Sequence, residues 1–473
     1  MRDGLDAETV WSRTGLPGKS YETPVDSYAV GCKWPVALSI PVDEQWRPGF
    51  YLLIMSFEHE GRIYEREHFA VIKRAPEADP APTALVLTTS TMLAYNDWGG
   101  ANHYRGLGDD PWEDVPSPLS AIQRPVARGM LRQPEDAPRS SNPSTPGPGY
   151  IPRHPAYEYA HVHGFSRHYA DAFWATYERH FVRWAEQHGY ELDYLTQHDL
   201  HEDQAVLDRY ACAVVVGHDE YWTGEMRDTA EGYVERGGHL ARFGGNFLWQ
   251  VRLEDNGNTQ ACYRTPQEDP LTPTEPSRVT TAWDSPVVGR PAATTFGLTG
   301  LGGCYNRYGT AAPRSSGGFT VYRPRHWAFT DTDLNYGDIF GAAPINVAAF
   351  ELDGVDFTFR KGMPEPTGVD GAPESLEIIA MTPATLGEED KWDGAVPLGA
   401  PVGEFLDALD AIYGDDLPER FKGECYGSGM VATFTKGAGE VFTAGSTEWV
   451  NGLRLSDPFT EQITHNVLRR FTS

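Results

Sequence analysis

His218 and Glu220 are the residues of this sequence best placed for chemistry. They follow the apolar, β-branched run 214–216 and Gly217, a pattern typical of a buried strand that ends in a turn. Strand side chains alternate, so residues two apart point to the same side, and an imidazole beside a carboxylate can bind a metal or move a proton. A polar loop that only precedes a helix is the competing interpretation, and this stretch alone leaves it open.

Other strand ends carry polar side chains of the same kind. The run 84–89 is typical of a second buried strand, and Tyr95 and Tyr104 follow it. A third run, 239–243, ends shortly before Asn246. Parallel strands in an open α/β sheet present their carboxyl ends at one edge. We therefore expect these residues to converge there: Tyr95, Tyr104, His218, Glu220 and Asn246. Coincidence is the alternative, since every strand has an end.

Two further features are less specific. Glu351 follows the apolar run 345–350, and a carboxylate in such a place either finds a partner or faces water on an edge strand. Four histidines near one another fit no standard metal-site spacing. We interpret them as parts of a solvated loop: His154, His161, His163 and His168.

The elements that must position these residues follow an α/β pattern. From 84 to 246 strand-like and helical runs alternate, which predicts a parallel, doubly wound sheet covered on both faces. A helix is expected over 166–188, because large apolar residues recur there every three or four positions. The region 255–445 is irregular and β-rich, and the chain contains no P-loop, GxGxxG or GxSxG motif.

The first 76 residues differ from the rest in pattern. Three β-like runs broken by Pro and Gly predict a small antiparallel β-sandwich: 36–40, 50–55 and 67–72. Residues 77–82 form a Pro-rich linker. We therefore predict an N-terminal domain over 1–76 and a larger α/β domain over 83–473.

Composition limits the partners of this chain. Its 473 residues include 39 Lys and Arg against 67 Asp and Glu, a formal net charge of −28. This balance argues against binding to nucleic acid or to an anionic membrane, both of which need a basic face. No apolar stretch reaches 18 residues and no apolar signal segment opens the sequence. We expect a soluble, cytoplasmic protein.

Several of these motifs, in this order, resemble the C-terminal domain of the large (β) subunit of N,N-dimethylformamidase. The likeness covers most of residues 83–473. The stretches that carry it are 91–100 with Tyr104, 217–222, 238–246, 350–354 and 444–449. The resemblance implies a flavodoxin-like α/β core of the kind found in class I glutamine amidotransferases.

The same resemblance implies a metal centre and its ligands. In that family a mononuclear iron is bound by two Tyr and one Glu, which correspond here to Tyr95, Tyr104 and Glu220. Tyr150 is a rival for the second phenol, because the loop between Tyr104 and Glu220 does not match the family. The neighbouring catalytic and substrate-orienting groups would be His218, Asn246 and Glu351.

The chemistry implied is hydrolysis of a small amide. Phenolate and carboxylate are hard oxygen donors that suit iron(III), which activates water and polarises a carbonyl. Two alternatives stay open: a non-catalytic binding or structural module on the same fold, and the same site with zinc or another metal. The family also has a small subunit, so either a small partner subunit or a homo-oligomer is compatible with the resemblance.

Overall fold

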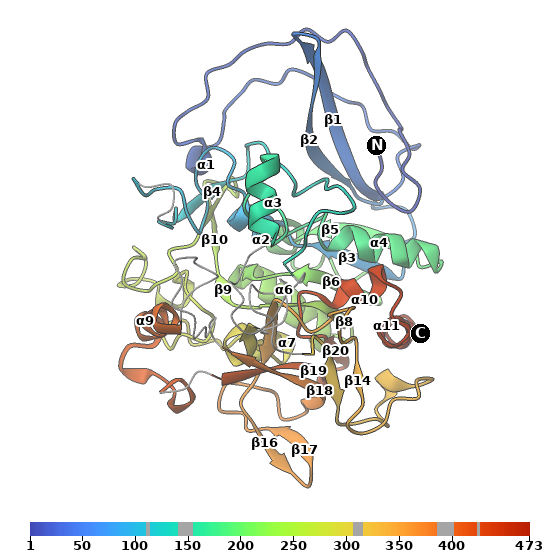
Figure 1. Cartoon of the computed structure of the whole chain (residues 1–473), viewed down its shortest axis with the longest axis vertical. Coiled ribbons are helices and arrows are strands. Elements are labelled where there is room, and N and C mark those ends of the chain that lie inside the picture. The colour runs from blue at the N-terminus through green and yellow to red at the C-terminus, as the bar shows by residue number, and fades with distance from the viewer. Residues whose placement is uncertain (110–113, 141–154, 306–315, 386–401, 423–425) are drawn as a thin grey trace.

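An 11-stranded mixed β-sheet forms the centre of the fold in the computed structural model (Figure 1). The structure describes residues 1–109, 114–140, 155–305, 316–385, 402–422 and 426–473. The main path of the sheet runs through β14 (Ile339–Phe340), β13 (Phe319–Val321), β18 (Glu377–Thr385), β19 (Tyr426–Lys436), β20 (Gly439–Thr443), β8 (His239–Gly245), β6 (Cys212–His218), β3 (Thr83–Leu87) and β5 (Leu192–Thr196). Beside this path, β12 (Cys304–Tyr305) pairs with β15 (Glu351–Gly354) and β18.

The half of the sheet from β20 to β5 is parallel, and the half from β14 to β20 is antiparallel. The predicted parallel strands between residues 84 and 246 are therefore confirmed. Their runs are continuously apolar because both faces are covered. Val214 and Val216 enter one hydrophobic core, whereas Val215, between them, enters the other, as the period of two in a strand requires.

Helices cover both faces of this parallel half. Side chains of α4 (Glu178–Gln187), α10 (Trp449–Arg454) and α11 (Pro458–Phe471) join the first core, and side chains of α5 (Gln197–Glu202) and α6 (Gly224–Glu235) join the second. The side chain of Thr223 caps α6 by accepting a hydrogen bond from the Met226 amide, and Thr is a residue type favoured at helix N-caps. Among the described residues, every helix is too short or too polar to cross a bilayer.

Shorter elements complete the chain. Three small sheets pair β10 (Arg252–Glu254) with β11 (Thr259–Ala261) and β4 (Leu119–Ala121), β16 (Phe357–Arg360) with β17 (Met363–Pro366), and β7 (Tyr221–Trp222) with β9 (Trp249–Gln250). The remaining α-helices are α1 (Ser27–Val30), α2 (Thr89–Tyr95), α3 (Pro155–His163), α7 (Ala293–Phe296), α8 (Gly300–Gly303) and α9 (Val402–Tyr413).

The prediction of an N-terminal β-sandwich is wrong. Residues 1–76 contain one two-stranded antiparallel sheet, β1 (Gly49–His59) and β2 (Arg62–Ile72), which extends from the body at the top of Figure 1. The third predicted run, 36–40, forms no strand. It lies between Pro35 and Pro41, and a proline has no amide to give to a strand ladder. With two strands alone, no second sheet exists to form a sandwich.

The helix expected over 166–188 is shorter than predicted. Helix α4 begins at Glu178, and residues 167–177 form turns. Phe173 has φ +71, a left-handed backbone that interrupts a helix. The apolar periodicity was misleading because Phe173 and Trp174 are fully buried in the same core as α4 without being helical.

The base of the β1–β2 hairpin packs on the main core through Phe50. This ring is 1% exposed and stacks on Trp174 with centroids 3.8 Å apart. We expect Phe50→Ala to lower the free energy of unfolding by about 3–5 kcal/mol, because it removes a buried aromatic and leaves a cavity. Phe57→Ala, at the 55% exposed end of the same hairpin, should change it by about 0.5 kcal/mol or less. Urea unfolding measures both; equal effects would contradict this packing.

Candidate metal and catalytic site

The structure brings the three predicted metal ligands to one point. Tyr95 is the last residue of α2, which directly follows β3. Its hydroxyl donates to Glu220 Oε2 at 3.0 Å. The Tyr104 hydroxyl lies 2.7 Å from that of Tyr95 and 2.8 Å from the same Glu220 oxygen. Three oxygen atoms from two distant parts of the chain are therefore in mutual contact. Tyr150, the rival for the second position, lies outside the described residues.

Asn102 shapes the turn that returns Tyr104 toward Tyr95. Its side-chain amide donates to the Tyr95 carbonyl at 2.9 Å, and its oxygen accepts from the Tyr104 amide at 2.9 Å. Asn102 is fully buried, so these bonds are shielded from water. The two phenol rings then stack with centroids 4.4 Å apart, which places both hydroxyls on the same side.

Glu220 is held from both ends. Its amide donates to the Thr91 hydroxyl at 3.0 Å, and its Oε1 accepts from Trp249 Nε1 at 2.8 Å. These contacts direct Oε2 toward the phenols. Glu220 is 3% exposed, so its charge must be compensated by neighbouring groups.

The predicted catalytic residues are next to this oxygen cluster. His218 Nε2 lies 3.2 Å from Glu220 Oε2 and 2.8 Å from Glu351 Oε2. Asn246 Nδ2 is 3.2 Å from the same ring nitrogen. Asn246 has φ +62, a left-handed conformation that Asn tolerates, and this turns the chain back at the end of β8. All six residues expected to form the site therefore meet.

Burial and charge set the protonation of these groups. Burial alone would lower the pKa of His218, but the Glu351 and Glu220 carboxylates raise it well above its usual value. Burial raises the pKa of Glu351, and His218 opposes that rise. Burial, with the Glu220 charge beside them, raises the pKa of Tyr95 and Tyr104 well above 10. Both phenols are therefore protonated at neutral pH until a cation is present.

A buried arginine joins the strands that carry the site. Arg242 donates to both Asp219 oxygens, with Nε at 2.9 Å from each, and forms an ion pair with Asp353. All three side chains are fully buried. Asp219 lies between His218 and Glu220 in sequence, so Arg242 fixes the turn that presents both.

A comparison with known protein families gives a match over almost the whole chain. Residues 1–465 match the family described as N,N-dimethylformamidase beta subunit-like, C-terminal. The chain belongs to this family. The match begins before residue 83, where the resemblance found in the sequence started. A comparison with curated proteins finds no match.

The donor set of this candidate site suits a metal with hard oxygen ligands. The oxygen–oxygen spacings of 2.7, 2.8 and 3.0 Å are close to the edge of an octahedron with metal–oxygen bonds of about 2.0–2.2 Å. Within the described part of the chain, no group of three His, Cys, Asp and Glu residues could hold a metal ion. A metal here therefore depends on the phenol oxygens.

Two residues that contact this candidate site were not predicted from the sequence. The Tyr221 hydroxyl donates to the Tyr104 hydroxyl at 2.7 Å, and Arg264 donates to Tyr221 at 3.3 Å. The Arg264 guanidinium also lies 4.1 Å from the centre of the Tyr104 ring, a cation–π contact. Tyr221 stands beside Glu220 in the motif and could have been proposed. Arg264 has no signal in the sequence.

The four histidines interpreted as a solvated loop do not share one environment. His154 lies outside the described residues, and His161 and His163 are exposed. His168 is 5% exposed and packs against the rings of Tyr95 and Tyr104. The solvated interpretation is therefore wrong for His168, which the turns of 167–177 carry into the site.

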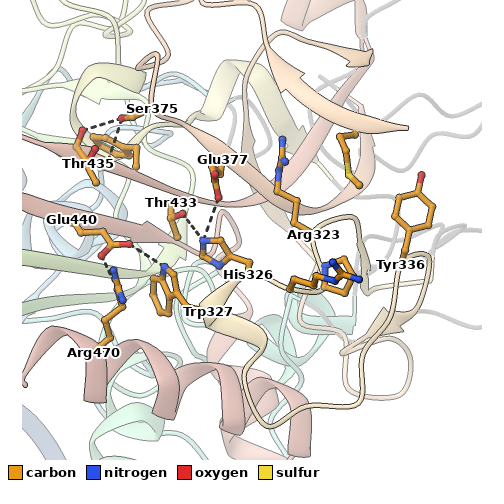
Figure 2. A pocket seen from close by; sticks show the side chains of 14 residues that line it. Arg323, His326, Trp327, Tyr336, Ser375, Glu377, Thr433, Thr435, Glu440 and Arg470 are labelled. Carbon is orange, nitrogen blue, oxygen red and sulfur yellow. Dashed lines mark hydrogen bonds and ion pairs between the residues drawn. The ribbon is translucent and has the colours of Figure 1, made fainter. Parts of the chain in front are cut away.

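A cleft of about 850 Å3 lies elsewhere, beside β18, β19 and β20 (Figure 2), and none of the predicted site residues lines it. Its polar groups already bind one another. Glu440 accepts from Trp327 at 3.1 Å and from Arg470 at 2.7 Å, and His326 bonds Thr433 at 3.1 Å. Burial lowers the pKa of His326 to about 4, so it is neutral at pH 7. Glu440 and His326, the polar groups of the cleft named here, are thus already paired.

Removing Arg242 should destabilise the protein strongly. Arg242→Leu leaves two buried carboxylates without their cation, and we expect the free energy of unfolding to fall by about 3–5 kcal/mol. The matched control is Arg236→Leu, whose 2.5 Å pair with Asp208 is half exposed and should contribute about 0–1 kcal/mol. Chemical unfolding monitored by tryptophan fluorescence measures both. An Arg242→Leu protein as stable as the Arg236→Leu control would contradict the stabilising role of the Arg242 ion pairs.

Proposed function

We propose that this chain is a metal-dependent hydrolase of a small amide, with one iron(III) bound by Tyr95, Tyr104 and Glu220. The observation that carries the proposal is the contact among the three oxygens at 2.7–3.0 Å, in a place where Tyr95 and Glu220 are buried and Tyr104 is half-buried. Membership in the dimethylformamidase family supports the class of substrate. Zinc or another metal in the same site is the second candidate.

Iron(III), when bound, supplies Lewis acidity that lowers the pKa of water and polarises an amide carbonyl. The remaining work falls to three neighbouring side chains. Glu351 Oε2 contacts His218 as an ion pair but makes no hydrogen bond of good geometry within the described residues, so it can accept a proton from attacking water. His218, held as an imidazolium, donates a proton to the leaving amine. Asn246 donates a hydrogen bond to the oxyanion that forms as water adds to the carbonyl carbon, before the carbon–nitrogen bond breaks.

We further propose that the core is flavodoxin-like, as in class I glutamine amidotransferases. The parallel strands lie in the order β5-β3-β6-β8-β20, which is 2-1-3-4-5 when they are numbered along the chain, and this order supports the assignment. The chemistry differs from that of an amidotransferase, which needs a cysteine nucleophile. Cys212 lies at the beginning of β6, fully buried, at the opposite end of the strand from His218.

We also propose that the chain assembles with another subunit, either a small partner or a second copy. The family name refers to a β subunit. An isolated two-stranded hairpin is marginally stable in water, and the outer part of the β1–β2 hairpin exposes apolar side chains. These are Ile54, Met55, Phe57 and Ile63. Light scattering of the purified chain, alone and with proteins it co-purifies with, measures the assembly.

Metal analysis tests the ligand set. We expect about one iron per chain and a phenolate-to-iron charge-transfer absorption that Tyr95→Phe abolishes, because the substitution removes one phenolate donor. Tyr336→Phe is the control, since Tyr336 lines the separate cleft and should leave both unchanged. A colourless, metal-free protein with an intact fold would favour the non-catalytic module, and zinc in place of iron would favour the second candidate.

Glu351→Gln should separate catalysis from metal binding. The variant removes the proposed proton acceptor but none of the three ligands, so we expect iron content to stay and kcat to fall by about 100- to 10,000-fold. Glu377→Gln in the cleft is the matched control and should keep full activity. Iron analysis with an amine-release assay measures both quantities. Loss of iron from Glu351→Gln would show that Glu351 is a ligand instead.

A further inference from the structure

Two arginines of the cleft beside β18, β19 and β20 take no part in the pairs described for it. Arg323, labelled in Figure 2, and Arg325 both line this cleft. Within the described residues neither forms an ion pair with a carboxylate, although the chain has 67 Asp and Glu against 39 Lys and Arg. Both guanidiniums are therefore available to an anion from outside the chain.

A proline turn places both arginines on the cleft. The His326 amide donates to the Arg323 carbonyl at 3.0 Å, which closes a four-residue turn with Pro324 in the second position and Arg325 in the third. Proline favours the second position of such turns because its ring fixes φ. The 3-10 helix η2 (Trp327–Phe329) follows directly, with His326 as its N-cap. The backbone that carries the two arginines is therefore fixed on both sides.

Backbone carbonyls orient the Arg323 guanidinium without cancelling its charge. Its Nε donates to the Ile378 carbonyl at 3.1 Å, and its Nη2 donates to the Pro364 carbonyl at 3.3 Å. A guanidinium has five N–H groups, and Nη1 makes no hydrogen bond within the described residues, so donors remain for a ligand. A side chain that is already ordered loses less conformational entropy when it binds.

Positive charge exceeds negative charge by one in this cleft. Its charged residues are three arginines and two glutamates: Arg323, Arg325, Arg470, Glu377 and Glu440. Glu440 pairs with Arg470 at 2.7 Å, and Glu377 lies 3.6 Å from His326. Burial, with the charges of Arg470 and Arg323 beside it, lowers the pKa of His326 to about 4, so this imidazole adds no charge at neutral pH. A monoanion cancels an excess of one charge, whereas a dianion would leave negative charge uncompensated.

The size and lining of the cleft indicate an organic ligand. Its volume of about 850 Å3 lies within the roughly 300–1,000 Å3 of pockets that hold organic molecules. Apolar side chains line it together with the arginines: Trp327, Met363 and Phe434. An inorganic ion would fill little of this space and would leave the apolar side chains uncovered.

We propose that this cleft is a second ligand site, which binds a carboxylate carried on an apolar body through the guanidiniums of Arg323 and Arg325. The planar fork of a guanidinium matches the two oxygens of a carboxylate, and the apolar lining covers the body. The proposal is independent of the amide hydrolysis, because none of the residues of the oxygen cluster lines this cleft.

The test titrates the purified protein with benzoate, a carboxylate on an apolar ring, and with benzyl alcohol, which has the ring without the charge. Ligand-observed NMR gives both dissociation constants. We expect the wild type to bind benzoate about tenfold tighter than benzyl alcohol, because hydrogen bonds between charged groups are stronger than those of a neutral hydroxyl. Arg323→Gln should bring the ratio of the two constants near one. Arg325→Gln should weaken benzoate binding by about threefold, as expected for a more exposed charge.

Arg360→Gln is the matched control. Arg360 belongs to the neighbouring strand β16, is paired with Glu365 at 3.4 Å and does not line the cleft, so its loss should leave the ratio unchanged. Arg325 makes no hydrogen bond within the described residues, so Arg325→Gln keeps the test valid even if Arg323→Gln disturbs the fold.

Three results would overturn the inference. The first is benzoate binding that neither Arg323→Gln nor Arg325→Gln weakens. The second is benzoate binding that Tyr95→Phe abolishes, which would place the carboxylate at the oxygen cluster instead. The third is tighter binding of phenyl phosphate, a dianion at pH 8, than of benzoate, which would contradict the choice of a monoanion. Iron content is not part of this test, so a metal-free protein that binds benzoate in the cleft would contradict the proposed function alone.

Discussion

The buried guanidinium of Arg242 is the interaction on which the site depends. Burial raises the pKa of Asp219 to about 6, and Arg242 opposes this rise. Burial would lower the pKa of Arg242 as well, but its two carboxylate partners, Asp219 and Asp353, raise it. Buried ion pairs of this kind add little net stability. What they provide here is position, because they join the middle of β8 and the end of β6 to β15. Asp353 also accepts from the Phe247 amide at 3.1 Å, just past Asn246.

Glycines allow the strands to approach that closely. A Cβ on Gly245 would lie 2.5 Å from the Thr447 amide nitrogen and 2.9 Å from the Glu351 carbonyl oxygen, and one on Gly217 would lie 2.3 Å from Tyr177. Gly217 also has φ +80, which other residues rarely adopt. The glycines of the two motifs are therefore part of the positioning of His218 and Glu351. A side chain at either place would push those groups away from the phenols.

Some features of this molecule follow from the local sequence, whereas others depend on contacts between distant residues. The parallel strands follow from continuous apolar runs, which need no knowledge of the rest of the chain. Convergence of their ends follows from the rules of α/β sheets, and this is why Tyr95, Glu220 and Asn246 could be grouped before the structure was known. A β-like run forms a strand only if it finds a partner strand, and the periodicity of its residues does not show whether it will. This is why the structure has a two-stranded hairpin where a sandwich was expected.

The residues that were missed depend on long-range contacts. Arg264 follows Tyr221 by 43 residues, has φ +67 and stacks over Tyr104, so its role arises only from the folded chain. The segment with His168 has the periodicity of a helix, yet the bond from His218 to the Asp171 carbonyl requires a turn. Tertiary contacts override local pattern in both places.

Charge balance gives a physical reason for using phenols in this site. Glu220 and Glu351 already place two carboxyl groups in this buried cluster, where His218 and Arg264 lie as the basic groups beside it. Two more carboxylates in place of Tyr95 and Tyr104 would leave unpaired negative charge in a buried place, which is costly. Phenols remain neutral there, because burial raises their pKa, and become anions only when a cation stabilises them. Under the proposed function, the site can therefore fold before a metal binds and still offer hard, anionic oxygens once one does.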